Sequence, residues 1–235
     1  MSDATPSRID DYLDVFVAPS KLFERRSDGK FGQALVVLVV VVAILFFATK
    51  SAMAPIMDAE MTKGMAGAMK ANPNMTPEQV EAAKRIGMTF APVAILAFFL
   101  IGPFLLGLVI LLVSKLVGGS LKFVQSVTIA TFAMFPRLVE TVVNAVQALL
   151  MDDSQLTSRL SVSVGLGRIL DPSTTSPYVL AMLGRVDVFT LWCTALIAIG
   201  LKVMGRVTTG QAVLGAAVVW LLGAAPVLWQ AMSQA

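Results

Sequence analysis

The sequence has no histidine and a single cysteine, Cys193, among 235 residues. Without histidine, the chain lacks a frequent metal ligand and the side chain that most often acts as a general base near neutral pH. A single cysteine cannot form an internal disulfide. These absences weigh against a metal centre and against catalysis by a Ser-His or Cys-His pair. We therefore expect no enzyme, no cofactor, no metal and no catalytic residue.

Charged residues are also scarce: they make up 14% of the chain, whereas 57% of the residues are hydrophobic. A soluble domain carries about 25% charged residues, so the composition indicates an integral membrane protein. The net charge of +3 is spread over the loops, which argues against a nucleic-acid partner. The first thirty residues lack the apolar centre of a cleaved signal peptide, so we expect the first apolar run to stay as a membrane anchor.

Five apolar runs are long enough to cross a bilayer as helices. They cover approximately residues 31–49, 88–113, 123–150, 188–204 and 212–232. These runs predict an all-α, five-span bundle in residues 31–235, preceded by a cytoplasmic tail in residues 1–30. Pro92 and Pro103 predict kinks in the second span, where Gly102 and Gly107 would allow close approach of another helix.

The N-terminal tail contains an amphipathic pattern. Its apolar residues follow helical spacing from Ile9 to Val17, after a capping signal at Thr5-Pro6 and before the helix breaker Pro19. Leu22 and Phe23 follow as a second apolar contact, with Lys21, Arg25, Arg26 and Lys30 close by. Basic residues beside apolar anchors suit the surface of an anionic membrane. Packing of the same helix beneath the bundle is an equally good interpretation.

The polar segment 50–85 carries methionines at a spacing of four residues: Met53, Met57, Met61, Met65 and Met69. Thioether clusters bind Cu(I), but no cysteine or histidine accompanies them, so we favour adaptable packing. Asn72-Pro73 predicts the end of one helix. Thr76 and Gln79, around Pro77, predict a capping box that begins the next.

The third apolar run carries an unusual polar stripe, formed by Arg137, Glu140, Asn144 and Gln147. Their offsets of three, four and three residues place them on one helical face. A charge in hydrocarbon costs at least a few kcal/mol, so we expect this face to meet protein or water. Arg137 and Glu140 lie three residues apart, so we expect them to neutralise each other in part. The stripe is either a structural interhelix pair or a polar site for a ligand, ion or proton. Pro136 predicts a kink beside it.

The loop that follows and the start of the fourth span give three further predictions. Alternating apolar residues from Leu160 to Leu166 predict a short extended segment. Ser176-Pro177 predicts a short helix through Leu183. Asp187 is a natural N-cap for the fourth span and is also a candidate member of the polar site. The candidate ligand-binding residues are therefore Arg137, Glu140, Asn144 and Asp187.

The short loops indicate the orientation in the membrane. The total numbers of Lys and Arg on the two sides are too similar to decide, but Lys115/Lys122 and Lys202/Arg206 flank short loops without acids. Basic short loops favour the cytoplasmic side, which predicts an inside N-terminus and an outside C-terminus. Both loops follow a Lys-x-x-Gly pattern, a weak internal similarity that is compatible with two similar helical hairpins.

Several short stretches, taken in order, resemble the bacterial branch of the Yip (Ypt/Rab-interacting protein) domain family. They are Val15-Phe-Val-Ala-Pro19-Ser-Lys-Leu-Phe23, Leu116-Val-Gly-Gly119, Ala133-Met-Phe-Pro136, Gly184-Arg-Val-Asp-Val-Phe-Thr-Leu-Trp192 and Ile199-Gly-Leu201. The resemblance covers about residues 12 to 230. It implies five spans in the cell membrane, in bacteria the inner membrane, with a cytoplasmic N-terminus.

Eukaryotic members of that family associate with small GTPases in vesicle traffic. Their Asp-Leu-Tyr-Gly-Pro motif is absent here, so we do not carry over that role. Asp187, Phe189 and Trp192 match a pattern of the family, but the resemblance supplies no catalytic function.

Two functional hypotheses follow. The first is a non-enzymatic membrane organiser that interacts with lipids, with membrane protein partners or with further copies of itself. The second is a small transporter or permease that uses the Arg137/Glu140/Asn144 stripe. An intramembrane enzyme is disfavoured because Ser126 and Thr131 are lone hydroxyls without a base.

The orientation can be tested with reporter fusions after Ala235 and within residues 50–85. We expect both positions to lie outside, so a reporter that is active only in the cytoplasm should be silent at each. Cytoplasmic activity at either position would contradict the topology.

Overall fold

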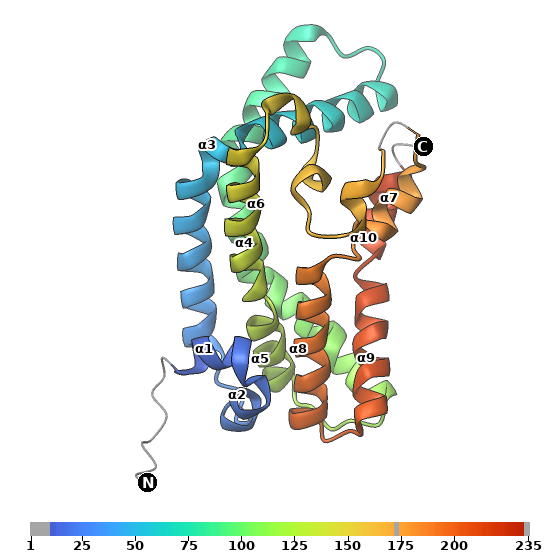
Figure 1. Ribbon diagram of the computed structural model, residues 1–235. Coiled ribbons are helices and arrows are strands. Elements are labelled where there is room, and N and C mark those ends of the chain that lie inside the picture. Colours follow the sequence, from blue (N-terminus) through green and yellow to red (C-terminus); the bar gives the residue numbers. More distant parts are fainter. Residues whose placement is uncertain (1–9, 172–173, 233–235) are drawn as a thin grey trace. The chain divides into compact units, whose positions relative to one another are not determined.

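The computed structural model describes residues 10–171 and 174–232 (Figure 1). Within these ranges the chain forms helices and no strand, apart from one isolated bridge between Gly165 and Asp187. Five segments are long and apolar enough to cross a membrane, which confirms the predicted all-α, five-span architecture. They are Gly32–Lys70, Pro77–Leu116, Phe123–Leu150, Val188–Gly205 and Thr209–Met232.

The helices occur in a simple order along the chain. The α-helices are α1 (Asp10–Val17), α2 (Pro19–Arg25), α3 (Gly32–Ala71), α4 (Pro77–Leu116), α5 (Phe123–Ala133), α6 (Pro136–Leu150), α7 (Pro177–Leu183), α8 (Val188–Gly205), α9 (Thr209–Leu222) and α10 (Ala225–Met232). Three 3₁₀ turns lie between α6 and α7: η1 (Asp153–Gln155), η2 (Arg159–Val162) and η3 (Leu166–Ile169).

Local capping signals give the boundary between α3 and α4. The backbone N–H of Thr76 donates to Oε1 of Gln79 at 3.0 Å, and the N–H of Gln79 donates to Oγ1 of Thr76 at 3.3 Å. This is the predicted capping box. Both helices extend beyond the apolar runs, because the polar residues that follow Thr49 are mostly good helix formers. The expected capping signal at Thr5-Pro6 lies outside the described residues.

Two spans are interrupted. α5 ends at Ala133 and α6 begins at Pro136, which confirms the predicted kink: proline lacks an N–H and is best accommodated in the first turn of a new helix. The fifth span, predicted at about residues 212–232, is confirmed as Thr209–Met232, but it breaks between Leu222 and Ala225. Gly223 and Pro226 together favour a new helix start there.

The chain divides into two compact units. The first unit contains residues 10–38, 100–137 and 191–222 of the described chain. The second contains residues 39–99, 138–190 and 223–232.

The first unit is built around α5, which is buried from Ser126 to Ala133. The N-terminal helices pack against this core: Leu22 and Phe23 of α2 are fully buried, and the Phe23 ring meets that of Phe132 at 6.5 Å. The rings of Phe16 and Trp192 lie 5.4 Å apart. Of the two interpretations of the tail helix, packing beneath the bundle is thus confirmed for α1 and α2.

Small residues, and hydroxyl groups that bond to the backbone of their own helix, make the tight packing of α5 possible. The hydroxyls of Ser126, Thr128 and Thr131 each donate to the carbonyl four residues earlier, so burial leaves none of them without an acceptor. Gly107 of α4 lies against Val127, as expected for a residue that lets two helices approach.

The second unit contains a hairpin formed by the C-terminal half of α3 and the N-terminal half of α4. Nζ of Lys84 lies 2.5 Å from a carboxylate oxygen of Asp58, and Met61 lies against Gly87. Met53 packs against a buried cluster that contains Ile56, Ala148, Leu156 and Val162. The packing interpretation is therefore confirmed for Met53 and Met61.

The extended segment predicted from Leu160 to Leu166 was wrong. These residues form η2 and the start of η3, and only Gly165 pairs in an extended manner with Asp187. The Leu166 N–H donates to Val186 O at 3.0 Å, and the Val188 N–H donates to Val164 O at 3.1 Å. A single bridge orients the segment, and the 3₁₀ turns η2 and η3 on either side of it are not revealed by alternation alone.

The close approach at Gly107 can be tested by Gly107→Ala. A Cβ atom there would lie 2.9 Å from the Val127 Cα, a backbone atom that cannot rotate away. We expect a loss of about 1–3 kcal/mol of stability, seen as a lower unfolding midpoint in detergent.

Gly210→Ala is the matched control, because nothing lies within 4 Å of the added Cβ. Ala in a helix should leave stability equal or raise it by about 0.5–1 kcal/mol. Equal midpoints for Gly107→Ala and Gly210→Ala would contradict the packing of Gly107 on α5.

Candidate functional site

The polar stripe predicted on the third span lies on α6, which carries Arg137, Glu140, Asn144 and Gln147. All four are half-buried, and neither Arg137 nor Glu140 is without an interaction. The neutralisation of Arg137 by Glu140 stays a prediction. The other polar residues of the candidate site have more specific surroundings.

Gln147 has a structural role in the second unit. Its Nε2 donates to Val162 O at 2.8 Å, and its Oε1 accepts a hydrogen bond from Arg168. Arg168 also approaches the sulfur of Met151 at 3.8 Å. Gln147 thereby holds the segment that contains η2 and η3 against α6, and both the nitrogen and the oxygen of its amide are engaged.

Asn144 differs from Gln147 in one respect. Its Oδ1 atom is buried and has no hydrogen-bond partner within residues 10–171 and 174–232. A buried acceptor left unsatisfied costs about 1–3 kcal/mol. Such an atom is suited to accept a hydrogen bond from water or from a ligand.

Asp187 caps α8, as the sequence predicted. Its Oδ1 accepts hydrogen bonds from the backbone N–H groups of Phe189 and Thr190, both at 3.0 Å, and its Oδ2 accepts one from the Thr190 hydroxyl. The residue is buried. Both carboxylate oxygens are therefore engaged within the first turn of α8, which accounts for Asp187 without a ligand.

The sequence analysis missed an ion-pair cluster that joins α1 to α2 in the first unit. Arg25 donates to Asp11 at 2.7 Å and to Asp14 at 2.6 Å, while Nε of Arg26 donates to the other oxygen of Asp11 at 2.6 Å. The Asp11 side chain is only 4% exposed. Arg25 and Arg26 were part of the pattern that suited a membrane surface, one of the two interpretations of the tail, but both charges are directed at acids of the same hairpin.

The ionisation of Arg25 follows from these contacts. Burial acts to lower its pKa, but the hydrogen bonds and charges of Asp11 and Asp14 outweigh burial and raise the pKa above its ordinary value. Arg25 is thus fixed as a cation. Two acids three residues apart, followed by Pro19 and an Arg pair, were the available sequence signal for this hairpin.

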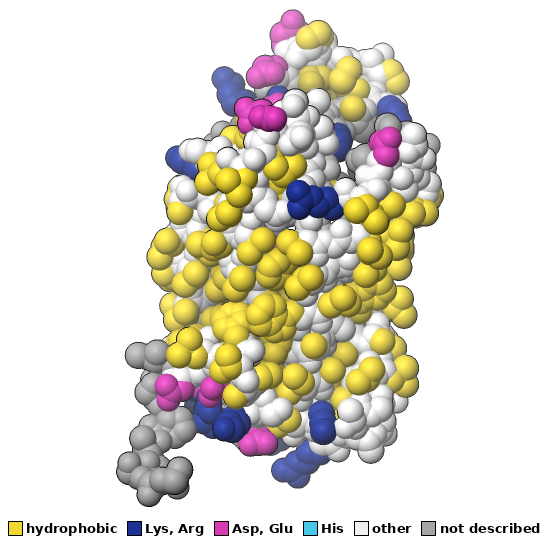
Figure 2. All heavy atoms as spheres, viewed as in Figure 1, with side chains coloured by type: hydrophobic (Ala, Val, Ile, Leu, Met, Phe, Trp, Pro, Cys, Tyr) yellow, Lys and Arg dark blue, Asp and Glu magenta, His cyan; other side chains and the backbone are white. Residues whose placement is uncertain are grey.

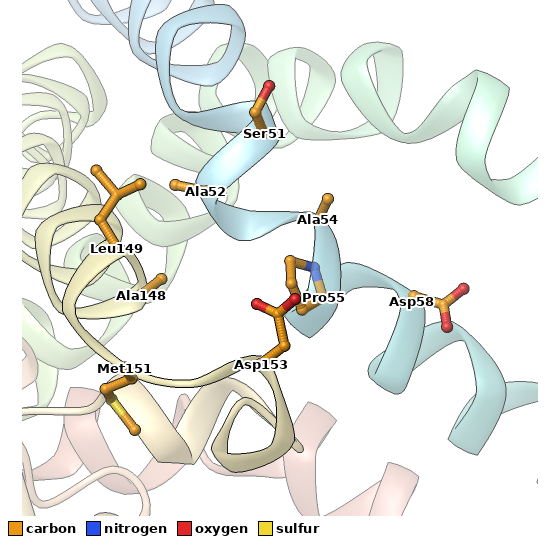
Figure 3. Close-up of a pocket in the computed structure, with 9 residues that line it drawn as sticks. All are labelled: Ser51, Ala52, Ala54, Pro55, Asp58, Ala148, Leu149, Met151 and Asp153. Atoms are coloured by element: carbon orange, nitrogen blue, oxygen red, sulfur yellow. The ribbon is translucent and has the colours of Figure 1, made fainter.

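The second unit also has an open hollow of about 600 Å³ (Figure 3). It is lined by Ser51, Ala52, Ala54, Pro55, Asp58, Ala148, Leu149, Met151 and Asp153. The Asp153 carboxylate lies toward Pro55, whereas Asp58 is turned away from it in Figure 3 and pairs with Lys84. In the part of the chain that the structure describes, no group of three or more His, Cys, Asp or Glu residues could hold a metal ion.

Comparison with known proteins assigns the family. The model of the Yip1 domain matches residues 13–230. The chain belongs to the Yip1 domain family. The match includes residues of both compact units of this Yip1 protein and confirms the resemblance seen in the sequence. No curated protein and no solved structure matches the chain.

The predicted pairing of Arg137 and Glu140 can be tested with single and double changes to Leu. Each single change should lower the unfolding midpoint, because it leaves the other charge uncompensated in a costly environment. The double change should recover part of the loss. If each single variant unfolds like the wild type, the two side chains reach water separately and the pairing is wrong.

The cap at Asp187 gives a second prediction. Asp187→Ala should cost about 0.5–2 kcal/mol of stability, whereas Asp187→Asn should be close to wild type because Asn is an equally good N-cap. Thermal unfolding of the purified protein in detergent measures both. A large loss with Asn would show that the charge itself is needed and would return Asp187 to the polar site.

Proposed function

We propose that this Yip1 protein is a non-enzymatic membrane organiser that interacts with partner proteins or lipids in the cell membrane. Its N-terminus would lie in the cytoplasm and its C-terminus outside, as the short basic loops suggest. The observation that carries the proposal is the folded N-terminal hairpin, in which the ion pairs of Asp11 and Asp14 join α1 to α2, while Phe23 packs on Phe132 of α5.

The hairpin offers a defined surface. Val15 of α1 is completely buried, whereas Leu13 is 63% and Val17 is 79% exposed on the same helix. Exposed apolar side chains on a rigid helix suit contact with another protein or with the edge of the bilayer. Because α1 is fixed in place, a partner would not have to order a mobile tail on binding.

Site-specific photo-crosslinking in the native membrane tests this role. A photoreactive residue at Leu13 or Val17 should form discrete protein or lipid adducts, and the same residue at buried Val15 should not. Adducts that are equally strong at all three positions, or absent at all three, would contradict the proposal.

The alternative function is a small transporter that uses Arg137, Glu140 and Asn144, with Asp187 as a possible further ligand-binding residue. The unsatisfied buried Oδ1 of Asn144 and the break before Pro136 favour this alternative. Saturable flux of an ion or solute into proteoliposomes, lost in Asn144→Leu and kept in Val146→Leu, would support transport. Val146 is the matched control because it lies on the same helix and is 50% exposed.

A further inference from the structure

Basic residues are distributed unevenly between the two units. Among the described residues, the first unit has nine Lys and Arg against five Asp and Glu, whereas the second unit has eight against nine. The net positive charge of the described chain therefore belongs entirely to the first unit.

Ion pairs use only some of these positive charges. Arg25 and Arg26 bind Asp11 and Asp14, and Nζ of Lys30 lies 2.7 Å from Asp28. The hydrogen bond from Lys30 lowers the pKa of Asp28, so this pair also is neutral overall. Five exposed basic residues of the first unit form no ion pair with any residue that the structure describes: Lys21, Lys115, Lys122, Lys202 and Arg206.

The fold brings the segments that carry these five residues together. The N–H of Ser120, in the loop between α4 and α5, donates to Gly205 O at the end of α8 at 3.2 Å. Nε2 of Gln125 donates to Ser27 O, just after α2, at 2.7 Å. Figure 1 shows α2 and both short loops at one end of the first unit, and Figure 2 shows Lys and Arg side chains gathered there.

The two short loops have similar construction, as their shared Lys-x-x-Gly pattern suggested. Each contains one residue in the left-handed region, Gly118 with φ of 82° and Arg206 with φ of 57°. Each is followed by a helix whose third residue, Gln125 or Gln211, accepts a hydrogen bond from the backbone N–H of the capping residue. These caps hold the backbone of the two loops, which connect the helix ends that carry Lys115, Lys122 and Lys202.

Apolar side chains flank the lysines at the same level. Leu116 beside Lys115 is 80% exposed, and Phe123 beside Lys122 is 44% exposed. This arrangement matches the boundary of a bilayer, where apolar side chains enter the acyl region and lysines extend toward the phosphates.

We propose that Lys21, Lys115, Lys122, Lys202 and Arg206 form a binding surface for the headgroups of anionic phospholipids. A membrane partner is favoured over a soluble acid because Lys115, Lys122, Lys202 and Arg206 lie at or beside the ends of helices long and apolar enough to cross the bilayer, and Lys21 lies on α2, whose following segment is hydrogen-bonded to the start of α5. Headgroups therefore surround them at high local concentration. The inference deepens the proposed organiser function, and it names one lipid class as a ligand.

The test uses the full chain in nanodiscs that contain equal amounts of phosphatidylglycerol and phosphatidylcholine. Native mass spectrometry of the released protein counts the lipids that stay bound. We expect phosphatidylglycerol to be enriched by at least about fivefold, the factor that one basic residue near an anionic surface provides. The enrichment should fall as the salt concentration is raised, because salt screens exposed charges.

A variant with Lys21, Lys115, Lys122 and Lys202 changed to Gln should lose the enrichment. The matched control changes Lys50, Lys63, Lys70 and Arg85 of the second unit to Gln, which also removes four exposed positive charges. This control should keep the enrichment. Arg206 is left unchanged because its φ of 57° makes substitution a backbone change as well.

Three results would overturn the proposal. The first is enrichment that survives in the Lys21/Lys115/Lys122/Lys202 variant or falls equally in the control. The second is enrichment in the wild type that does not change with salt concentration. This measurement needs only the wild-type protein, so it decides the question even if the variant fails to fold. The third is displacement of phosphatidylglycerol by equimolar glycerol phosphate or poly-glutamate, which would assign the surface to a soluble anion or an acidic protein. Absence of phosphatidylglycerol enrichment on the wild-type protein, with intact protein adducts at Leu13 and Val17, would refute this inference alone and leave the organiser function standing.

Discussion

The carboxylate of Asp11 lies between two arginines, and this interaction determines which surface the N-terminal segment presents. Asp11 is nearly inaccessible to solvent, and Arg25 and Arg26 each bind one of its two oxygens. A buried acid held in this way is costly to unpair. The cluster folds α1 onto α2, directs Val15, Leu22 and Phe23 into the first unit, and leaves Leu13 and Val17 outside.

The same interaction shows which positive charges are paired within the protein and which remain free to bind another molecule. An exposed arginine pair beside apolar residues looks like a membrane-binding signal in the sequence, but here both guanidinium groups stabilise the hairpin. The lysines of the two short loops have no such partner among the described residues. The available positive charge therefore lies at the ends of the membrane-spanning helices, where anionic headgroups would meet it.

Local and periodic signals made much of the fold predictable. The five apolar runs, the Thr76–Gln79 capping box, the break at Pro136 and the cap at Asp187 each depend on neighbouring residues, and each was confirmed. Contacts distant in sequence were not predictable. The Asp11 cluster joins residues 14 and 15 positions apart, and a single bridge at Gly165 replaces the strand expected near Leu160.

In the candidate site, too, the local features were predictable from the sequence and the contacts between distant residues were not. Helical spacing correctly placed Arg137, Glu140, Asn144 and Gln147 on α6, but spacing does not distinguish a ligand-binding amide from a structural one. Gln147 is engaged by Val162 and Arg168, whereas the Oδ1 of Asn144 is unsatisfied within the described residues. Only the positions of the surrounding loops separate these two amides, and those positions depend on distant residues.

Hydrogen–deuterium exchange of residues 10–26 in Asp11→Asn tests the central claim most directly. The change keeps the shape of the side chain and removes the charge that both arginines share. Glu24→Gln, an exposed position on α2, is the matched control. We expect exchange at least about tenfold faster across the hairpin in Asp11→Asn, from a loss of about 1.5–3 kcal/mol, and no change in Glu24→Gln. Equal exchange in the two variants would show that the hairpin is held by its apolar contacts alone, and it would contradict the account.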